Sequence, residues 1–245
     1  MISRLKAMLV DILLPNRCGS CARVISWDKT VCDKCEKQLE KEFISVCKIC
    51  GKKPCKNHDL QVFDGITVLF DYSGQARKAV RMLKYHRGLN FAPYCAKHLA
   101  QRLKDDKLDV QTDLVTCVPM SHKKRRIKGY DHAELIAREL AKELGKPLDC
   151  KLLVHAQTGT EQHSMNAKNR RAHANACFSC AEKHSDISGK TVLICDDIYT
   201  TGSTLNACAL LLKGMGAKKV IAAAAATTHF KLSKERVDVK ARKQS

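Results

Sequence analysis

The sequence contains no apolar run near the ~18 residues that a membrane-spanning helix requires. Its N-terminal stretch, residues 1–15, combines basic residues with leucines, but Asp11 interrupts the apolar run and no small-residue cleavage site follows. Apolar residues recur here at helical spacing, so we predict a short amphipathic helix that packs on the protein rather than on a membrane. A secreted or membrane-spanning protein is thereby disfavoured, and we expect a cytoplasmic location.

Aromatic and acidic residues are both scarce. Phe, Tyr and Trp make up 5% of the chain, which leaves few platforms on which nucleic-acid bases stack. Only 25 Asp and Glu oppose 44 Lys and Arg, so the formal net charge of the 245 residues is +19. A surface this basic attracts polyanions such as nucleic acid or phosphorylated ligands. The alternative is that scattered lysines only keep the protein soluble.

Cysteine, by contrast, is abundant, and half of the 14 residues precede residue 56. Two CxxC pairs in this region bring four thiolates together, which suits tetrahedral zinc. A set of disulfides is the alternative, but it requires an oxidising compartment, and nothing in the sequence indicates secretion. We therefore predict a zinc site formed by Cys18, Cys21, Cys32 and Cys35.

A second cluster of soft ligands follows, with a shorter gap between its two pairs. His58 is either a ligand of this cluster or a surface histidine, and the ligand pairs either stay separate or interleave between the two sites. The pair at 177–180 has CxxC spacing but no second pair nearby, so we do not interpret it as a metal site. The expected cofactor is one or two zinc ions, with the second held by Cys47, Cys50, Cys55 and His58.

Downstream of the cysteine clusters, apolar stretches of strand and helix character alternate. This alternation is typical of a parallel sheet covered by helices on both faces. In such sheets ligands bind at the carboxyl ends of the strands. We predict an α/β fold with strands at 65–72, 113–119, 191–195 and 219–227, and helices at 74–86, 90–104, 131–145 and 203–216.

The stretch VLICDDIYTTGST, residues 192–204, ends a predicted strand with two adjacent aspartates. Carboxylates in a crevice at that point accept hydrogen bonds from the vicinal hydroxyls of a ribose. The turn that follows directs N–H groups and hydroxyls to a helix N-terminus, which suits a phosphate, and Gly202 lets the backbone come close. No Lys follows the glycine, so this is not a nucleotide P-loop. Helix capping alone would explain one Asp or Thr but not the whole run.

Two basic runs accompany this stretch, at 121–128 and 168–171. The first directly follows a predicted strand, where Lys and Arg, together with Mg²⁺, would neutralise a pyrophosphate leaving group. The same side chains would also grip the phosphates of a DNA backbone, and a charge run is often only a solvated face. The candidate nucleic-acid residues are Lys123, Lys124, Arg125, Arg126, Lys128, Lys168, Arg170 and Arg171.

The 192–204 stretch closely resembles the phosphoribosyl-pyrophosphate motif of type I phosphoribosyltransferases. Together with the two cysteine clusters and the segments VPMSHKKRRIKGYDHAELIARELA and TGTEQHSMNAKNRRAHANACF, it makes the chain resemble the ComF family from residue 1 to about residue 230. These are the competence-associated proteins of bacterial natural transformation. The resemblance implies a zinc-ribbon-like module with an N-terminal helix at 1–60, a phosphoribosyltransferase-like domain at 61–232 and a basic tail at 233–245.

The resemblance also implies roles for individual residues. Asp196 and Asp197 would contact the ribose hydroxyls and act as the catalytic acids, and segment 157–175 would be a hood over the site. The 5-phosphate would be held by Thr200, Thr201, Gly202, Ser203 and Thr204. The pyrophosphate loop would consist of Met120, Ser121, His122, Lys123 and Lys124.

The sequence departs from the family pattern in two places. GYDHAE, residues 129–134, stands where the family usually has a form like GFNQAE, so Asp131 and His132 are unusual. The second cysteine cluster is compressed, with His58 at a position that is more often cysteine.

Two functions are compatible with these features. The first is a phosphoribosyl-pyrophosphate-binding protein that acts in DNA uptake, with Mg²⁺, single-stranded DNA and other proteins of the uptake machinery as partners. The second is a Mg²⁺-dependent phosphoribosyltransferase with an unknown acceptor and no direct role in DNA binding. No pocket for an acceptor base can be identified in the sequence, so whether transfer occurs stays open.

Overall fold

The structure is a computed structural model that describes residues 15–55, 58, 61–85, 88–108, 111–156 and 177–228. The predicted N-terminal helix, the predicted hood and the predicted basic tail lie outside the described residues. So do three of the candidate nucleic-acid residues, namely Lys168, Arg170 and Arg171.

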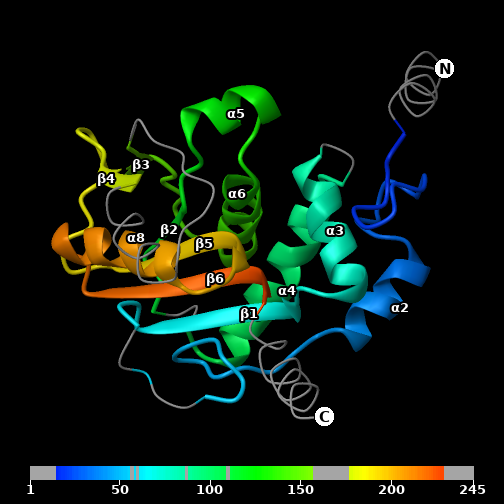
Figure 1. The fold of residues 1–245 in the computed structure, drawn as a ribbon, viewed down its shortest axis with the longest axis horizontal. Helices are drawn as coiled ribbons and strands as arrows, with labels where there is room; N and C mark the ends of the chain where they lie inside the picture. Colours follow the sequence, from blue (N-terminus) through cyan, green and yellow to red (C-terminus); the bar gives the residue numbers. More distant parts are fainter. Residues whose placement is uncertain are drawn as a thin grey trace, which may run out of the picture.

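A four-stranded parallel sheet forms the centre of the protein (Figure 1), with the strand order β1-β6-β5-β2. Its strands are almost continuously apolar and buried, as expected for a sheet covered on both faces. The predicted α/β fold is therefore confirmed. The strands are β1 (Gly65–Asp71), β2 (Leu114–Cys117), β5 (Thr191–Tyr199) and β6 (Lys219–Thr227).

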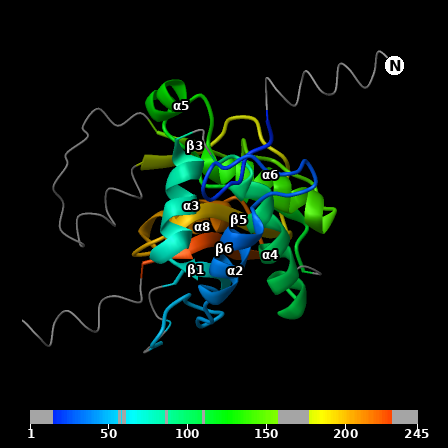
Figure 2. The ribbon, with the colours of Figure 1, turned by 90° about the vertical axis from the view of Figure 1, so that its right-hand side faces the viewer.

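Each face of the sheet carries its own hydrophobic core. Figure 2 shows the helices that surround the central strands. One core includes side chains of α2 (Asp33–Lys41), α3 (Gly74–Lys84), α4 (Phe91–Asp105) and α6 (His132–Leu144). The other includes side chains of α8 (Ser203–Gly214) and β3 (Leu153–His155), which pairs antiparallel with β4 (Phe178–Cys180). The region of the second cysteine cluster also reaches this second core, through Val46, Val62 and Phe63.

Two local features differ from the sequence prediction. Strand β5 continues to Tyr199, because β6 runs alongside it beyond the end of β2, so the two aspartates lie within the strand rather than after it. Residues His122–Lys128, of which 122–124 were expected in the pyrophosphate loop, form the short helix α5. The Ser121 hydroxyl accepts a hydrogen bond from the Lys124 N–H at the start of α5, and Gly129 ends it in the left-handed conformation. Only Met120 and Ser121 of the predicted pyrophosphate loop therefore stay in a loop.

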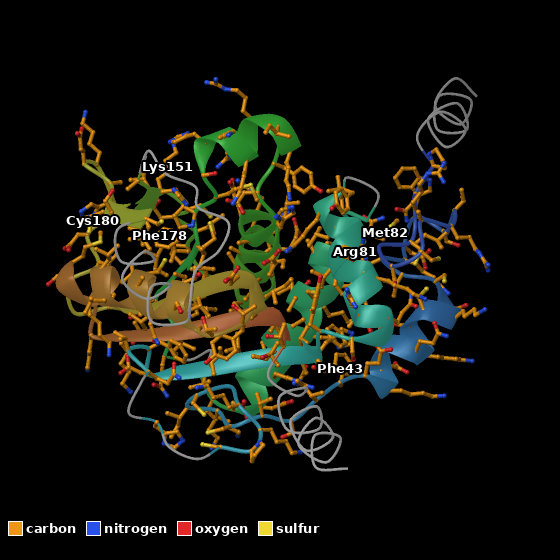
Figure 3. All side chains as sticks on the ribbon, in the orientation of Figure 1. Phe43, Arg81, Met82, Lys151, Phe178 and Cys180 are labelled. Atoms are coloured by element: carbon orange, nitrogen blue, oxygen red, sulfur yellow. The ribbon has the colours of Figure 1, made fainter. Side chains whose placement is uncertain are left out.

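The first cysteine region packs into the core rather than standing apart from it. Leu39 of α2 is fully buried, and Phe43, labelled in Figure 3, stacks on Phe70 of β1 at a centroid distance of 4.8 Å. The Glu42 carboxylate accepts hydrogen bonds from the N–H groups of Gln75 and Ala76, at 2.8 and 2.7 Å. Because the N-cap residue of α3 makes no side-chain cap, Glu42 satisfies that helix end instead.

Asp131 ties the start of α6 to the segment that follows β2. One carboxylate oxygen accepts hydrogen bonds from the N–H groups of Ala133 and Glu134, at 3.0 and 3.4 Å. The other accepts the N–H of Met120 at 2.8 Å. Burial raises the pKa of Asp131, although these three donors oppose that rise. The unusual aspartate is thus the N-cap of a helix.

Replacing Asp131 by Ala should lower the free energy of unfolding by about 2–4 kcal/mol, because a helix cap is lost and the half-buried Met120 amide loses its acceptor. Asp131→Asn should cost less, since one oxygen still caps α6 while the amide group faces another N–H donor at Met120. Denaturant unfolding measures both. Asp105→Ala, at an exposed position near the end of α4, should stay within about 0.5 kcal/mol. Equal stabilities for Asp131→Ala and Asp105→Ala would contradict the assignment.

Candidate functional site

The turn between β5 and α8 presents an array of polar groups. Gly202 is the N-cap residue of α8 and has a φ of 82°. The hydroxyls of Thr201 and Ser203 lie 2.7 Å apart, and the Ser203 N–H donates to the Thr201 hydroxyl at 3.4 Å. Thr200 and Thr201 are exposed, and Ser203 and Thr204 are half-buried. The N–H groups at the start of α8 thus lie beside hydroxyls, an arrangement suited to an anion.

A glycine is required at position 202 for two reasons. A φ in the left-handed region is unfavourable for residues with a side chain. A Cβ at this position would also approach the Tyr199 ring within 3.0 Å and its hydroxyl within 3.1 Å. The turn therefore rests directly on the last residue of β5.

The two aspartates at the end of β5 are half-buried. Asp197 Oδ2 lies 2.8 Å from Lys84 Nζ, and Asp196 Oδ1 accepts the backbone N–H of Asp197 at 2.7 Å. Burial, together with the charge of Asp197, raises the pKa of Asp196 well above its ordinary value. The acid pair therefore favours a single negative charge, which the ammonium of Lys84 compensates.

Lys84 was not found by sequence reasoning, since it is the last residue of α3 and lies far upstream of the acid pair. A second lysine, Lys128 at the end of α5, shares this environment: burial and the charge of Lys84 lower its pKa, while Asp197 and Asp131 oppose that change. The side chains facing the acid pair thus come from α3, α5 and α6.

His132, the second unusual residue, also faces the pair, with Nδ1 3.9 Å from Asp197 Oδ2. Burial lowers the pKa of His132 to about 4; Asp197 opposes this, and Lys128 and Lys84 add to it. The imidazole is therefore neutral at neutral pH. It supplies a polar group to the site but no positive charge.

The exposed helix α5 carries most of the first basic run. Residues 122–127 are all exposed, and Figure 1 shows the helix projecting at the top of the molecule. Arg125 pairs with Glu134 at 2.8 Å, and Glu134 also pairs with Arg138 at 2.9 Å. Glu134 therefore offsets the charge of Arg125. Among the described residues of α5 that are predicted to contact DNA, the positive charges least offset by acidic neighbours are those of Lys123, Lys124 and Arg126.

The ligand atoms of the first cysteine cluster, Cys18, Cys21, Cys32 and Cys35, all lie within 4.8 Å of one another. The Sγ atoms of Cys21 and Cys32 are 3.9 Å apart, and Cys18 Sγ accepts the N–H groups of Ser20 at 3.4 Å and Cys32 at 3.2 Å. Hydrogen bonds of this kind stabilise thiolates. The donor set and its spacing fit a tetrahedral zinc ion.

The second cluster is equally compact, with His58 among its ligands. His58 Nε2 lies 3.3 Å from Cys47 Sγ and 3.1 Å from Cys55 Sγ. The Cys47 pKa falls to about 6: burial would raise it, but backbone N–H groups of Cys50 and Ile49 and the His58 ring lower it. Sulfur atoms, yellow in Figure 3, gather in this loop beneath β1. The two ligand sets stay separate, so the interleaved arrangement is wrong.

The remaining cysteines are not metal ligands in this structure. Cys95, Cys117, Cys177, Cys195 and Cys208 are buried, while Cys150 is half-buried and Cys180 is exposed. None of the 14 cysteines forms a disulfide. Within the described ranges, no helix has the length and apolar character that crossing a bilayer requires.

Comparison with known proteins identifies two domain families. The double zinc ribbon domain matches residues 9–63, and the phosphoribosyl transferase domain matches residues 131–244. Among solved structures, the chain is similar to a purine phosphoribosyltransferase from Pyrococcus horikoshii. The TM-score is 0.36 and the identity 21%, over 55% of this chain and 70% of that one.

Curated relatives align over most of the chain. Competence protein F from Haemophilus influenzae is 25% identical over 201 residues, covering 78% of this chain and 87% of that protein. DNA utilization protein YhgH from Escherichia coli K12 is 24% identical over 209 residues, covering 83% and 86%. Competence protein ComFC from Bacillus subtilis is 22% identical over 205 residues, covering 78% and 81%.

Metal analysis of the purified protein should find two zinc ions per chain. Cys18→Ser combined with Cys35→Ser should lose one of them, because two of four ligands are gone, and should make residues 15–43 sensitive to protease. Cys180→Ser, which changes an exposed cysteine outside both clusters, should keep both ions. An unchanged zinc content in the double variant would refute the first site.

Proposed function

Since this chain is a ComF-type protein, with a double zinc ribbon followed by a phosphoribosyl transferase domain, we propose that it binds phosphoribosyl pyrophosphate and acts in DNA uptake for natural transformation. The names of its relatives support the role in competence. The arrangement of the site at the end of β5 supports phosphoribosyl pyrophosphate as the ligand. The thiolate zinc ligands suit a reducing compartment, so a cytoplasmic location is part of the proposal.

One observation carries the choice of ligand: an acid pair and an anion-suited turn follow one another in one strand–turn–helix unit, with only residues 198 and 199 between them. A ribose 5-phosphate presents vicinal hydroxyls and a phosphate within one small molecule. Asp196 and Asp197 accept the hydroxyl hydrogen bonds, and residues 200–204 with the N–H groups of α8 bind the 5-phosphate. Capping of α8 alone does not account for the carboxylates, whose nearest cation comes from α3.

The pyrophosphate end of the ligand requires positive charge. In this proposal Lys84, Lys128 and the N-terminal part of α5, together with the loop residues Met120 and Ser121, supply it. A bound Mg²⁺ would neutralise part of the charge of the pyrophosphate. Lys84 then has two roles: it compensates Asp197 in the free protein and attracts the pyrophosphate when the ligand binds.

The alternative is a Mg²⁺-dependent phosphoribosyltransferase without a direct role in DNA binding, favoured by the match to the transferase domain. Its reaction would break the bond between the ribose C1 and pyrophosphate through a cationic sugar transition state, and would form a bond from C1 to a nucleophilic acceptor. The acid pair lies where it would stabilise positive charge on the sugar. The acceptor stays unidentified.

Single-stranded DNA is the proposed polymeric partner, bound mainly through its phosphates. The net charge of +19 and the exposed side chains of α5 support this proposal. Direct contact with other proteins of the uptake machinery is part of the same proposal.

Asp197→Asn should weaken binding of magnesium phosphoribosyl pyrophosphate by roughly tenfold to a hundredfold, since hydrogen bonds to a charged acceptor contribute about 1.5–3 kcal/mol. Inorganic phosphate should bind the variant as well as or better than wild type, because a negative charge has been removed. Asp28→Asn removes the same charge at an exposed position and serves as the control. Titration calorimetry of the three proteins measures this, and equal affinities would refute the ribose assignment.

Neutralising Lys123, Lys124 and Arg126 should weaken binding of all single-stranded DNA sequences alike. The slope of log affinity against log salt should fall by about 2, because each phosphate contact contributes ~0.7 on a single strand. Neutralising Lys97, Lys104 and Lys107, exposed positions on or after α4, changes the net charge equally and should leave the slope nearly unchanged. Fluorescence anisotropy at several salt concentrations separates the two sets. Wild-type protein that binds no DNA would favour the alternative function.

A further inference from the structure

The second metal cluster and the phosphate-binding turn meet at one side chain. Tyr199, the last residue of β5, is buried, and its hydroxyl donates a hydrogen bond to the backbone carbonyl of Cys50 at 2.8 Å. Cys50 is a ligand of the second cluster. Three residues beyond Tyr199, Gly202 begins α8 and the turn proposed to hold the 5-phosphate.

The Tyr199 ring packs closely against glycines on both sides. A Cβ at Gly51 would approach the ring within 3.0 Å, and so would a Cβ at Gly202. Since a Cβ has no room at either glycine, both backbone segments lie close against the ring and restrict its movement. The loop after Cys50 and the turn at Gly202 therefore hold opposite sides of the same ring.

A second connection joins the same two regions. The N–H of Val62, which follows the second cluster, donates to the side-chain oxygen of Asn206 in α8 at 2.8 Å. Phe63 packs edge-on against the Tyr199 ring, with centroids 6.2 Å apart. The second cluster region thus contacts both the residue before the turn and the helix after it.

The first cluster has different neighbours. The Gln75 side chain at the start of α3 donates to Ser20 at 2.6 Å and to Cys35 Sγ at 3.5 Å. Gly19 lies against the backbone of Asn90 and Phe91, at the start of α4. The first cluster therefore contacts the starts of α3 and α4, whereas the region of the second cluster contacts β5 and α8. A variant of the first cluster can thus serve as the control for a variant of the second.

We infer that Tyr199 is a positioning residue through which zinc in the second cluster orders the anion-binding turn at residues 200–204. Bound zinc fixes the Cys47–Cys55 loop, that loop fixes the Tyr199 ring, and the ring fixes the backbone at Gly202. The identity of the anion as the 5-phosphate rests on the proposed function, but the ordering of the turn does not. Coupling between sites is reciprocal, so an anion bound at the turn also slows zinc release from the second cluster.

Hydrogen exchange of the backbone amides tests the coupling without any ligand. Cys55→Ser removes a ligand of the second cluster and should increase exchange at residues 200–204. Cys21→Ser removes a ligand of the first cluster and should leave that turn unchanged. Equal exchange at the turn in the two variants would overturn the inference.

Tyr199→Phe keeps the ring and all eight zinc ligands but removes the hydrogen bond to Cys50. It should retain both zinc ions and still show faster exchange at residues 200–204. Tyr94→Phe is the matched control, because Tyr94 is equally buried and its hydroxyl has no hydrogen-bond partner among the described residues. If Tyr199→Phe exchanges like Tyr94→Phe, the hydrogen bond does not transmit the order and the inference fails.

Zinc release to a chromogenic chelator, with and without magnesium phosphoribosyl pyrophosphate, provides the reciprocal test. In wild type the ligand should slow release from the second cluster by about fivefold or more, and in Tyr199→Phe this protection should largely disappear. A ligand that binds by calorimetry without slowing release overturns the coupling. A wild type that binds no phosphoribosyl pyrophosphate overturns the proposed function instead, while the exchange experiment still decides the inference.

Discussion

Two adjacent carboxylates at the end of a buried strand repel each other and lose hydration. Much of the surrounding structure offsets the free-energy cost of this repulsion and desolvation. Lys84 provides the nearest cation, and it is held there because α3 spans from the first cysteine region to the acid pair. Glu42 caps one end of that helix and Lys84 occupies the other. The zinc ribbon therefore contributes to the electrostatics of a site in the other domain, since the placement of α3 decides where its last residue lies.

The lysines around the site fall into two groups that differ in burial. Lys84 and Lys128 are partly buried beside the acid pair, whereas the lysines of α5 are exposed. Charges of the first kind act on a small ligand within a few ångströms and are screened little by salt. Charges of the second kind act on a polymer and are screened strongly. The two proposed ligands therefore share only the side chains at the N-terminal end of α5.

The sequence predicted features that are encoded within short stretches. The parallel sheet follows from apolar runs, the two metal clusters from cysteine spacing, and the turn at 200–204 from a run of hydroxyl residues with one glycine. Features that depend on distant partners were missed. Lys84 has no local signal, the extension of β5 depends on pairing with β6, and the hydrogen bond from the Met120 N–H to the Asp131 carboxylate joins residues 11 positions apart. The short helix α5 was missed because seven mostly charged residues show no amphipathic period.

The strand order carries a consequence for how the chain is made. β1 is complete at Asp71, but β6, its only neighbour in the sheet among the described residues, begins at Lys219. At ribosomal speeds of about 5–20 residues per second, β1 waits on the order of ten seconds for its partner. During that interval its apolar residues and unpaired backbone are open to wrong pairing. The segment at 43–48, which bonds to β1 through Ile44 and Lys48, is synthesised earlier and covers one edge at once. The zinc ribbon region is thus available to cover one edge of β1 before β6 has been synthesised, and it keeps that contact in the folded protein.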